Sequence, residues 1–250
     1  MALAWLDYVE ENKEEKSTDA SLKGQSRQAS KHGAWLVTTV AEFVIGGPLG
    51  PWDAVGIHFS PDGVANVGNT WLRCDRNLTP GIHSWALFEA PHRDDSIDGL
   101  ITTHVDELPQ LGETIGESDG SFRLDIAGVD HVVVNTPDLH RTSDAIAVAT
   151  GGSLKRVRDA GNGMQQGFHR LGGVIVEIVS TRQSKIGPES KVGPASFWGL
   201  VFVVDDLDAV FDHLGTDLLS PPKPAVQPEL RIATFRAEAK LGIPCALMSR

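Results

Sequence analysis

Cysteine is scarce in this chain, and its scarcity excludes two classes of small protein. Of 250 residues only two are cysteines, Cys74 and Cys245, and they lie far apart. Two distant thiols form neither a disulfide framework nor a zinc motif of paired cysteines. We therefore expect a protein that folds on an ordinary hydrophobic core in a reducing compartment, of which the cytoplasm is the simplest.

Positive charge and long apolar runs are also in short supply. Lys and Arg number 22 against 33 Asp and Glu, which gives a formal net charge of −11. An acidic surface repels phosphate backbones and anionic lipids, so neither nucleic acid nor a membrane is expected as a partner. No apolar run is long enough to span a bilayer, and the N-terminal sequence turns acidic too early for a secretory signal.

Changes in composition divide the sequence into four segments. Residues 1–33 are polar and charge-rich and predict a flexible N-terminal segment. Residues 34–105 contain short β-branched and aromatic runs at 54–59, 64–72 and 82–88, each predicted to be a strand, between Gly and Pro breaks. This pattern is typical of a small β-rich unit. Residues 106–125 are polar and glycine-rich and indicate a linker, after which residues 126–250 form a further domain.

The segment 126–250 contains one pattern twice. A strand, a helix and three further strands are predicted in that order, over 132–134, 139–148, 153–157, 164–171 and 174–179. The order recurs, with a strand at 198–204, a helix from 205 to 214 and later strands at 232–237 and 243–248. Asp206-Leu207 follows Asp138-Leu139 by 68 residues, and Ser249 follows Ser180 by 69. Such a constant offset indicates an internal repeat of units too small to fold alone.

The repeated elements resemble the vicinal-oxygen-chelate superfamily, also called the glyoxalase, bleomycin-resistance and extradiol-dioxygenase superfamily. The resembling segments are GVDHVVVNTPDL (128–139), GFHRLGGVIVEIV (167–179), FWGLVFVVDDLDAV (197–210) and RIATFRAEAKLGIPCALM (231–248). The resemblance implies an α+β fold in which paired β-α-β-β-β modules form a curved mixed sheet around a cleft. The preceding β-rich unit is then either a degenerate extra module or a cover for the open side of the sheet.

The resemblance also implies candidate metal ligands. Metal enzymes of the superfamily carry His, Glu or Gln ligands on the first and last strands of each module. Carried over, the first module supplies His131 and Glu177, and His169 on its penultimate strand is a candidate third ligand. The counterparts in the second module are Gly199 and Ala246, whose side chains cannot bind a metal. The implied cofactor is a divalent ion (Zn, Mg, Mn, Fe, Ni or Co) completed by water or substrate oxygens.

The chemistry of the residues leaves three roles open for the same pair. Strand alternation places Glu177 on one face with Ile175 and Val179, which predicts shielding from water. A shielded carboxylate needs a partner or a proton. His131 and Glu177 therefore hold a metal together, or form a metal-free hydrogen-bonded pair, or leave Glu177 as a general base whose pKa is raised by burial.

Two weaker signals lie on neighbouring strands. Gln165 and Gln166 either line the cleft or belong to a half-exposed strand. Lys155, Arg156 and Arg158 form a small basic patch that either steers an anionic substrate or is a solvated strand edge.

These observations predict a glyoxalase-like protein that acts on or binds a small oxygenated metabolite, such as a 2-oxo or 2-hydroxy acid derivative. As an enzyme it would be a metal-dependent lyase or isomerase of the glyoxalase or epimerase type, with Glu177 as a catalytic residue. The alternatives are a metal-free protein that sequesters a small molecule, which Gly199 and Ala246 favour, and a structural module without a ligand. Extradiol ring cleavage requires His169 to face the same cleft. A homodimer that shares a cleft also stays open.

Overall fold

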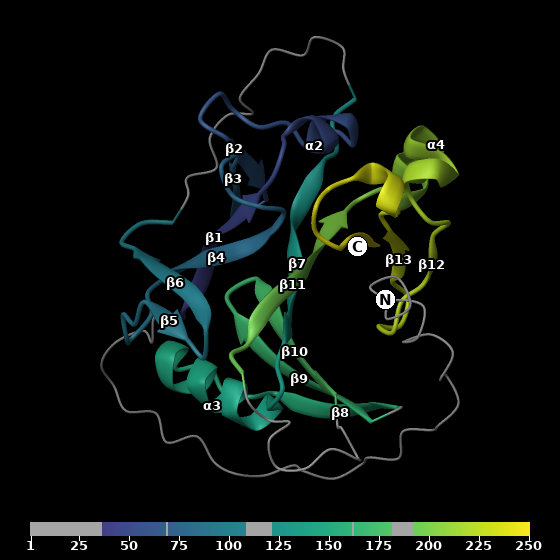
Figure 1. Ribbon diagram of the computed structural model, residues 1–250. Coiled ribbons are helices and arrows are strands. Elements are labelled where there is room, and N and C mark those ends of the chain that lie inside the picture. The colour runs from purple at the N-terminus through teal and green to yellow at the C-terminus, as the bar shows by residue number, and fades with distance from the viewer. Residues whose placement is uncertain (1–36, 69, 109–121, 162, 182–192) are drawn as a thin grey trace, which may run out of the picture. The chain divides into compact units, whose positions relative to one another are not determined.

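The computed structural model describes residues 37–68, 70–108, 122–161, 163–181 and 193–250. The predicted flexible segment 1–33 and most of the predicted linker lie outside the described residues. Residues 37–250 form one compact unit, and its strands make one sheet of six and one of eight (Figure 1). The six-stranded sheet lies within 34–105 and the eight-stranded sheet within 126–250.

The eight-stranded sheet consists of two β-α-β-β-β modules. The first contains β7 (Ile126–Asn135), α3 (Leu139–Thr150), β8 (Arg156–Gly161), β9 (Met164–Leu171) and β10 (Val174–Thr181). The second contains β11 (Ser196–Val204), α4 (Leu207–Leu218), β12 (Lys223–Pro224), β13 (Arg231–Thr234) and β14 (Cys245–Ser249). In each module the last strand pairs in parallel with the first, and β7 and β11 pair antiparallel at the centre.

The strand order of this sheet is β12-β13-β14-β11-β7-β10-β9-β8. The sheet curls into a half-barrel, with α3 and α4 on its outer, convex side (Figure 1). The predicted α+β fold of paired modules in a curved mixed sheet is therefore confirmed.

Helix α3 begins where the sequence provides both a stop for the strand and a cap for the helix. Pro137 follows β7, and the side chain of Asp138 accepts hydrogen bonds from the backbone N–H groups of His140 and Arg141. Gly151 ends the helix in the left-handed conformation at φ 69°. Asp206 caps α4 in the same way by accepting from the N–H of Ala209.

The six-stranded sheet repeats the module pattern in reduced form. Its elements are β1 (Thr39–Gly46), α2 (Gly50–Ala54), β2 (Val64–Val67), β3 (Thr70–Asp75), β4 (Gly81–Phe88), β5 (Ser96–Ile97) and β6 (Leu100–Val105). β1 pairs in parallel with β3, β4 in parallel with β6, and β1 and β4 antiparallel with each other. Each half has one strand fewer than a full module, and the half formed by β4, β5 and β6 also has no helix. This topology favours the first alternative, a degenerate extra module, and it contains two reduced halves rather than one.

Two strand predictions in this region are wrong. The predicted strand at 54–59 is instead the end of α2 and a turn, because Pro51 starts a short helix and Trp52 fills the core at 1% exposure. The predicted single strand at 64–72 is a hairpin of β2 and β3. Its turn contains Gly68 at φ 75°, where a Cβ would lie 2.2 Å from the carbonyl oxygen of Ala127. That close approach of two backbones requires glycine.

The two sheets share one hydrophobic core. Phe197 of β11 packs edge-on against Trp85 of β4 and Phe43 of β1, with ring centroids 5.3 and 6.4 Å apart. Both Trp85 and Phe43 are fully buried. Aromatic pairs of this geometry add to the free energy gained by burial alone.

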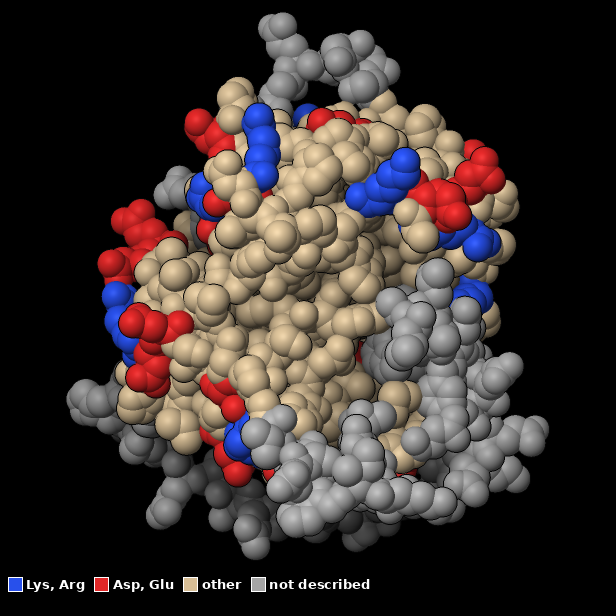
Figure 2. Space-filling model, in the orientation of Figure 1, with Lys and Arg blue, Asp and Glu red and all other residues tan. Residues whose placement is uncertain are grey.

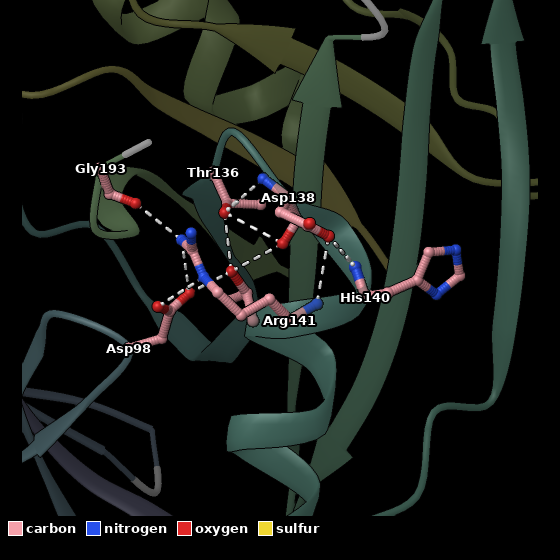
Figure 3. A network of polar contacts seen from close by, with 7 residues as sticks. Asp98, Thr136, Asp138, His140, Arg141 and Gly193 are labelled. Carbon is pink, nitrogen blue, oxygen red and sulfur yellow. Dashed lines mark hydrogen bonds and ion pairs between the residues drawn. The ribbon is translucent and has the colours of Figure 1, made fainter. Parts of the chain in front are cut away.

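A polar network also joins the six-stranded sheet to the start of α3 (Figure 3). Arg141 pairs with the Asp98 carboxylate at 2.9 Å and donates to the carbonyl oxygen of Gly193 at 2.7 Å. Thr142 donates a hydrogen bond to the same carboxylate. Because the Asp98 side chain is only 12% exposed, these contacts compensate a charge that is largely removed from water.

The surface is not uniformly acidic. On the face shown in Figure 2, charged side chains lie around the edge and the centre is uncharged. Among the described residues no helix combines the length and the hydropathy needed to cross a membrane.

Candidate functional site

His131 and Glu177 meet on the concave face of the eight-stranded sheet. In the parallel pairing of β7 with β10, Glu177 lies opposite Val133, two residues beyond His131. His131 Nε2 lies 3.6 Å from Glu177 Oε2, and the two side chains are 15% and 10% exposed. Their strand neighbours Val132 and Val176 point to the opposite, helix-covered face and are fully buried. The alternation that the sequence predicted thus brings the two candidate residues together.

Asp130 fixes the orientation of the His131 ring. Its Oδ2 lies 2.7 Å from His131 Nδ1. Since a carboxylate only accepts, Nδ1 carries the hydrogen and donates it, and Nε2 is left facing Glu177. The two residues are adjacent in sequence but make this contact because the pairing of β11 with β7 passes from His131 directly to Val129. Such a bulge lets consecutive side chains meet, and sequence alone gave no signal for it.

Gln166 and Arg158 extend the contacts across β9 and β8. Gln166, 1% exposed, donates from Nε2 to Glu177 Oε1 at 2.6 Å. Its Oε1 accepts from Arg158 Nε at 2.8 Å and from a second Arg158 nitrogen. The amide therefore presents its N–H to the carboxylate and its oxygen to the guanidinium. The result is a polar relay (Asp130, His131, Glu177, Gln166 and Arg158) that spans four neighbouring strands.

The two central groups of this relay have shifted pKa values. Burial raises the pKa of Glu177, against the opposing influence of the charges on His131 and Arg158. Burial lowers the pKa of His131, but the hydrogen bond to Asp130 and the charge of Glu177 outweigh it, and the net pKa is raised. The site therefore holds a carboxyl group and an imidazole whose pKa values are both raised. Such pairs are a recognised mark of functional sites.

His169 lies on the other face of the sheet. It pairs with Val176 in the register of β9 with β10, and is 1% exposed beneath α3. Its Nδ1 lies 3.0 Å from the carbonyl oxygen of Gly152, so Nδ1 donates and Nε2 accepts from the Ser143 hydroxyl at 2.8 Å. Burial lowers the pKa of His169. The structure does not bring this residue together with His131 and Glu177, and both of its ring nitrogens have partners.

The second module offers no matching ligands. A Cβ at Gly199 would lie 2.6 Å from the carbonyl oxygen of Pro244, so no larger residue fits there without a backbone shift. Ala246 lies opposite Val201, two residues beyond Gly199, and so occupies the place that Glu177 has in the first module. Within the described part of the chain, no three His, Cys, Asp or Glu side chains are grouped to hold a metal. These residues supply two ligands, which does not fit a centre with three protein ligands.

The concave face of the second module is apolar instead. Val201, Ala246 and Met248 form a buried cluster separate from the main core, with Leu230 and Ile232 packed against it. Val201 lies directly opposite His131 in the pairing of β11 with β7. The His131–Glu177 pair therefore stands at the border between a polar and an apolar half.

A cavity of about 480 Å³ lies at the end of the six-stranded sheet, away from this pair. It is lined by Gly47, Pro48, Leu49, Arg76, Leu78 and Pro80. Arg76 is the one charged residue in that lining. Because it pairs no acid with a base, the cavity is a poorer candidate for proton chemistry than the concave face.

No protein-family model and no curated protein matches the sequence. Among solved structures, a triple mutant of 4-hydroxymandelate synthase from Streptomyces coelicolor matches 86% of this chain and 93% of its own, at 15% identity and a TM-score of 0.58. Methylmalonyl-CoA epimerase from Mycobacterium tuberculosis matches 50% of this chain and 88% of its own, at 17% identity and a TM-score of 0.40.

The match to 4-hydroxymandelate synthase covers 86% of the chain, more than either sheet alone occupies, and it shows the fold. That enzyme is a member of the vicinal-oxygen-chelate superfamily. The resemblance seen in the sequence is thereby confirmed: this chain has the fold of the vicinal-oxygen-chelate superfamily.

Proposed function

We propose that this chain is a glyoxalase-like protein that binds a small oxygenated metabolite at His131 and Glu177 and moves a proton at a carbon next to its carbonyl group. One observation carries the proposal. The 3.6 Å between His131 Nε2 and Glu177 Oε2 is too long for a good hydrogen bond, while each residue is held from behind by another partner. Both facing atoms are therefore available to a third group.

The two residues have complementary roles in such a reaction. Glu177 Oε2 takes the proton from the carbon, and the electron pair of the C–H bond moves to the carbonyl oxygen. Burial raises the pKa of Glu177 and so strengthens it as a base. In the protonated form of His131 both ring nitrogens carry a hydrogen, so Nε2–H donates to the oxygen that becomes negative while Nδ1–H stays bound to Asp130, which stabilises the imidazolium. Return of the proton from Glu177 to the same face restores the substrate, with exchange against solvent between the two steps. Protonation of the opposite face by a water molecule inverts the carbon and completes an isomerisation, and the proton on Glu177 then passes to solvent.

A metal-dependent form of the same site is the second candidate. The Asp130 carboxylate on His131 Nδ1 is the kind of support that metal-binding histidines commonly have, and Nε2 and Glu177 Oε2 face each other. A bound divalent ion would polarise the substrate oxygens. The described residues supply two of its ligands and leave the others to water and substrate, so the metal-free form is favoured.

Exchange of substrate protons with solvent tests the proposal. Incubation with a series of 2-oxo acids in D₂O, followed by NMR, measures the loss of the proton beside the carbonyl group. We expect exchange in the wild type after treatment with a chelator, none in Glu177→Gln, and unchanged exchange in Asp208→Asn, which alters an exposed ion pair with Arg231. Exchange that needs an added divalent ion would favour the metal form. Saturable binding without any exchange would leave a sequestering protein and contradict the proposed chemistry.

A further inference from the structure

Three arginines share the concave face with Glu177. Residues paired across neighbouring strands project to the same face. Phe168 lies opposite Glu177, and Arg156 lies opposite Phe168. By the same registers Arg158 lies opposite Gln166, and Arg170 lies opposite Ile175. In a chain with a net charge of −11, this concentration of cations on β8 and β9 is a local reversal of charge.

These guanidinium groups are not neutralised by neighbouring carboxylates. Arg156 lies over the ring of Phe168 at 5.2 Å from its centroid, and Arg158 binds the neutral amide of Gln166. Within the described ranges no carboxylate oxygen lies within 4.0 Å of Arg156, Arg158 or Arg170. Burial lowers the pKa of Arg158; the charge of Glu177 opposes this effect, and the nearby charge of Arg156 adds to it. A bound anion would relieve that cost.

Glu177 makes no direct ion pair with these arginines, because Gln166 stands between them. The amide receives the guanidinium on its oxygen and gives its N–H to the carboxylate. An anion held by Arg156 and Arg158 is therefore separated from the negative charge of Glu177 by one side chain. The planar guanidinium group matches the geometry of a carboxylate or a phosphate.

The other side of the His131–Glu177 pair is apolar. In the strand order, β7 and β10 lie between β8 and β9 on one side and β11 and β14 on the other. The cluster of Val201, Ala246 and Met248 belongs to β11 and β14. Across the sheet, the concave face thus carries first the arginines, then the His131–Glu177 pair and then an apolar surface.

From this arrangement we infer that the ligand is an amphipathic oxyanion. Its carboxylate or phosphate group is bound by Arg158 and Arg156, its carbonyl group lies at His131 and Glu177, and its apolar chain lies toward the Val201–Met248 side. The inference rests on the proposed function, whose substrate class it names, and it makes Arg158 and Arg156 determinants of specificity.

Titration calorimetry on the full chain tests the inference with three matched probes. 5-Oxononanoate carries all three features and separates its carboxylate from its carbonyl group by three methylenes, enough to pass Gln166; 4-octanone lacks the charge, and 5-oxohexanoate lacks the chain. We expect 5-oxononanoate to bind at least about tenfold more tightly than either, since charged hydrogen bonds and chain burial each contribute that much. Hexyl phosphate against hexanoate then separates a phosphate from a carboxylate preference.

Variants connect the binding to the named residues. Arg158→Gln is expected to weaken 5-oxononanoate binding about tenfold or more and to leave 4-octanone binding unchanged. Arg156→Gln repeats the test at an exposed position with no hydrogen bond to lose, so misfolding cannot account for its effect. Arg231→Gln, at an exposed ion pair with Asp208, is the control with no expected change.

The outcomes separate the two levels of the account. Equal affinity for 5-oxononanoate and 4-octanone, no binding of any probe, or full affinity in both arginine variants would overturn the inference. If the arginine variants lose binding but Glu177→Gln still exchanges protons like the wild type, the inference stands and the proposed function fails. If exchange depends on Glu177 but binding does not change in the arginine variants, the proposed function stands and the inference about the ligand fails.

Discussion

The two modules of the eight-stranded sheet have the same topology and opposite chemistry at equivalent places. In the first module Glu177 lies opposite Val133, two residues past His131; in the second Ala246 lies opposite Val201, two residues past Gly199. One pair is polar and joined to a relay, and the other is apolar and closely packed. The fold therefore supplies two similar positions, and their side chains make only the first of them suited to the proposed chemistry.

The six-stranded sheet adds a third version of the same position. Arg73 lies opposite Val44, two residues past Glu42, and the two form an ion pair at 2.8 Å. Arg73 is 40% exposed, and its partner's charge satisfies it. Such a closely paired and partly exposed charge mainly stabilises the sheet. The longer distance between His131 and Glu177 is the difference on which the proposed function rests.

The largest expected effect separates the first module from the second. Glu177→Gln removes the base and should lower proton exchange by about 10²- to 10⁴-fold, the usual contribution of general acid–base catalysis. Ala246→Ser at the matching place of the second module should change exchange little. NMR exchange rates in D₂O measure both. Comparable losses in the two variants would show that the modules are not functionally different.

The next effect concerns stability and is expected in the second module rather than the first. Gly199→Ala places a Cβ 2.6 Å from the carbonyl oxygen of Pro244, which is too close. The substitution should therefore destabilise the fold by about 1–3 kcal/mol. The control is Gly50→Ala, since a Cβ there meets nothing within 4 Å. Urea unfolding of both variants measures the difference. An unchanged midpoint for Gly199→Ala would mean that the second module could accept a ligand side chain.

The two histidines on opposite faces of the first module should give pH effects of opposite sign. Burial lowers the folded pKa of His169 below its ordinary 6.5, so its contribution to stability is present above that pH and is lost as the pH falls. The folded pKa of His131 is raised, so its contribution is present below pH 6.5 and is lost as the pH rises through the folded value. Unfolding of His169→Gln and His131→Gln between pH 5 and 8 measures each contribution. The same slope in both variants would contradict the assignment of the faces.

The smallest effect is expected at the ion pair of the six-stranded sheet. Arg73→Gln breaks a partly exposed pair and should cost no more than about 1 kcal/mol, with proton exchange unchanged. Thermal unfolding at low and high salt is the measurement. A loss of exchange in this variant would show that the third position takes part in function after all.

The contact between His131 and Glu177 could be predicted from the sequence, but the residues around this pair could not. Strand alternation and the parallel pairing of first and last strands place His131 beside Glu177. The contact of Asp130 depends on a bulge, and the role of Gln166 depends on a diagonal contact between strands, neither of which leaves a pattern in one sequence. His169 is the candidate that the sequence placed wrongly. Its face depends on its pairing with Val176 in the register of β9 with β10, and that register is not visible in the sequence.

The six-stranded sheet was recognised as β-rich but not in its details. Its module pattern is hidden because α2 spans only Gly50–Ala54 and the half formed by β4, β5 and β6 has no helix. Without a helical period between strands, a repeat cannot be read from hydrophobic spacing. The parallel pairings that reveal it are contacts between residues distant in sequence.

The titration of His131 tests the central claim most directly, because it requires no substrate. NMR of the ring carbons would follow His131 and His169 from pH 5 to 9 in the wild type and in Glu177→Gln. The account predicts a His131 pKa above 6.5 that falls when Glu177 loses its charge, while His169 titrates below 6.5 in both proteins. A His131 pKa at or below 6.5 that does not respond to Glu177→Gln would contradict the acid–base pair on which the proposed function depends.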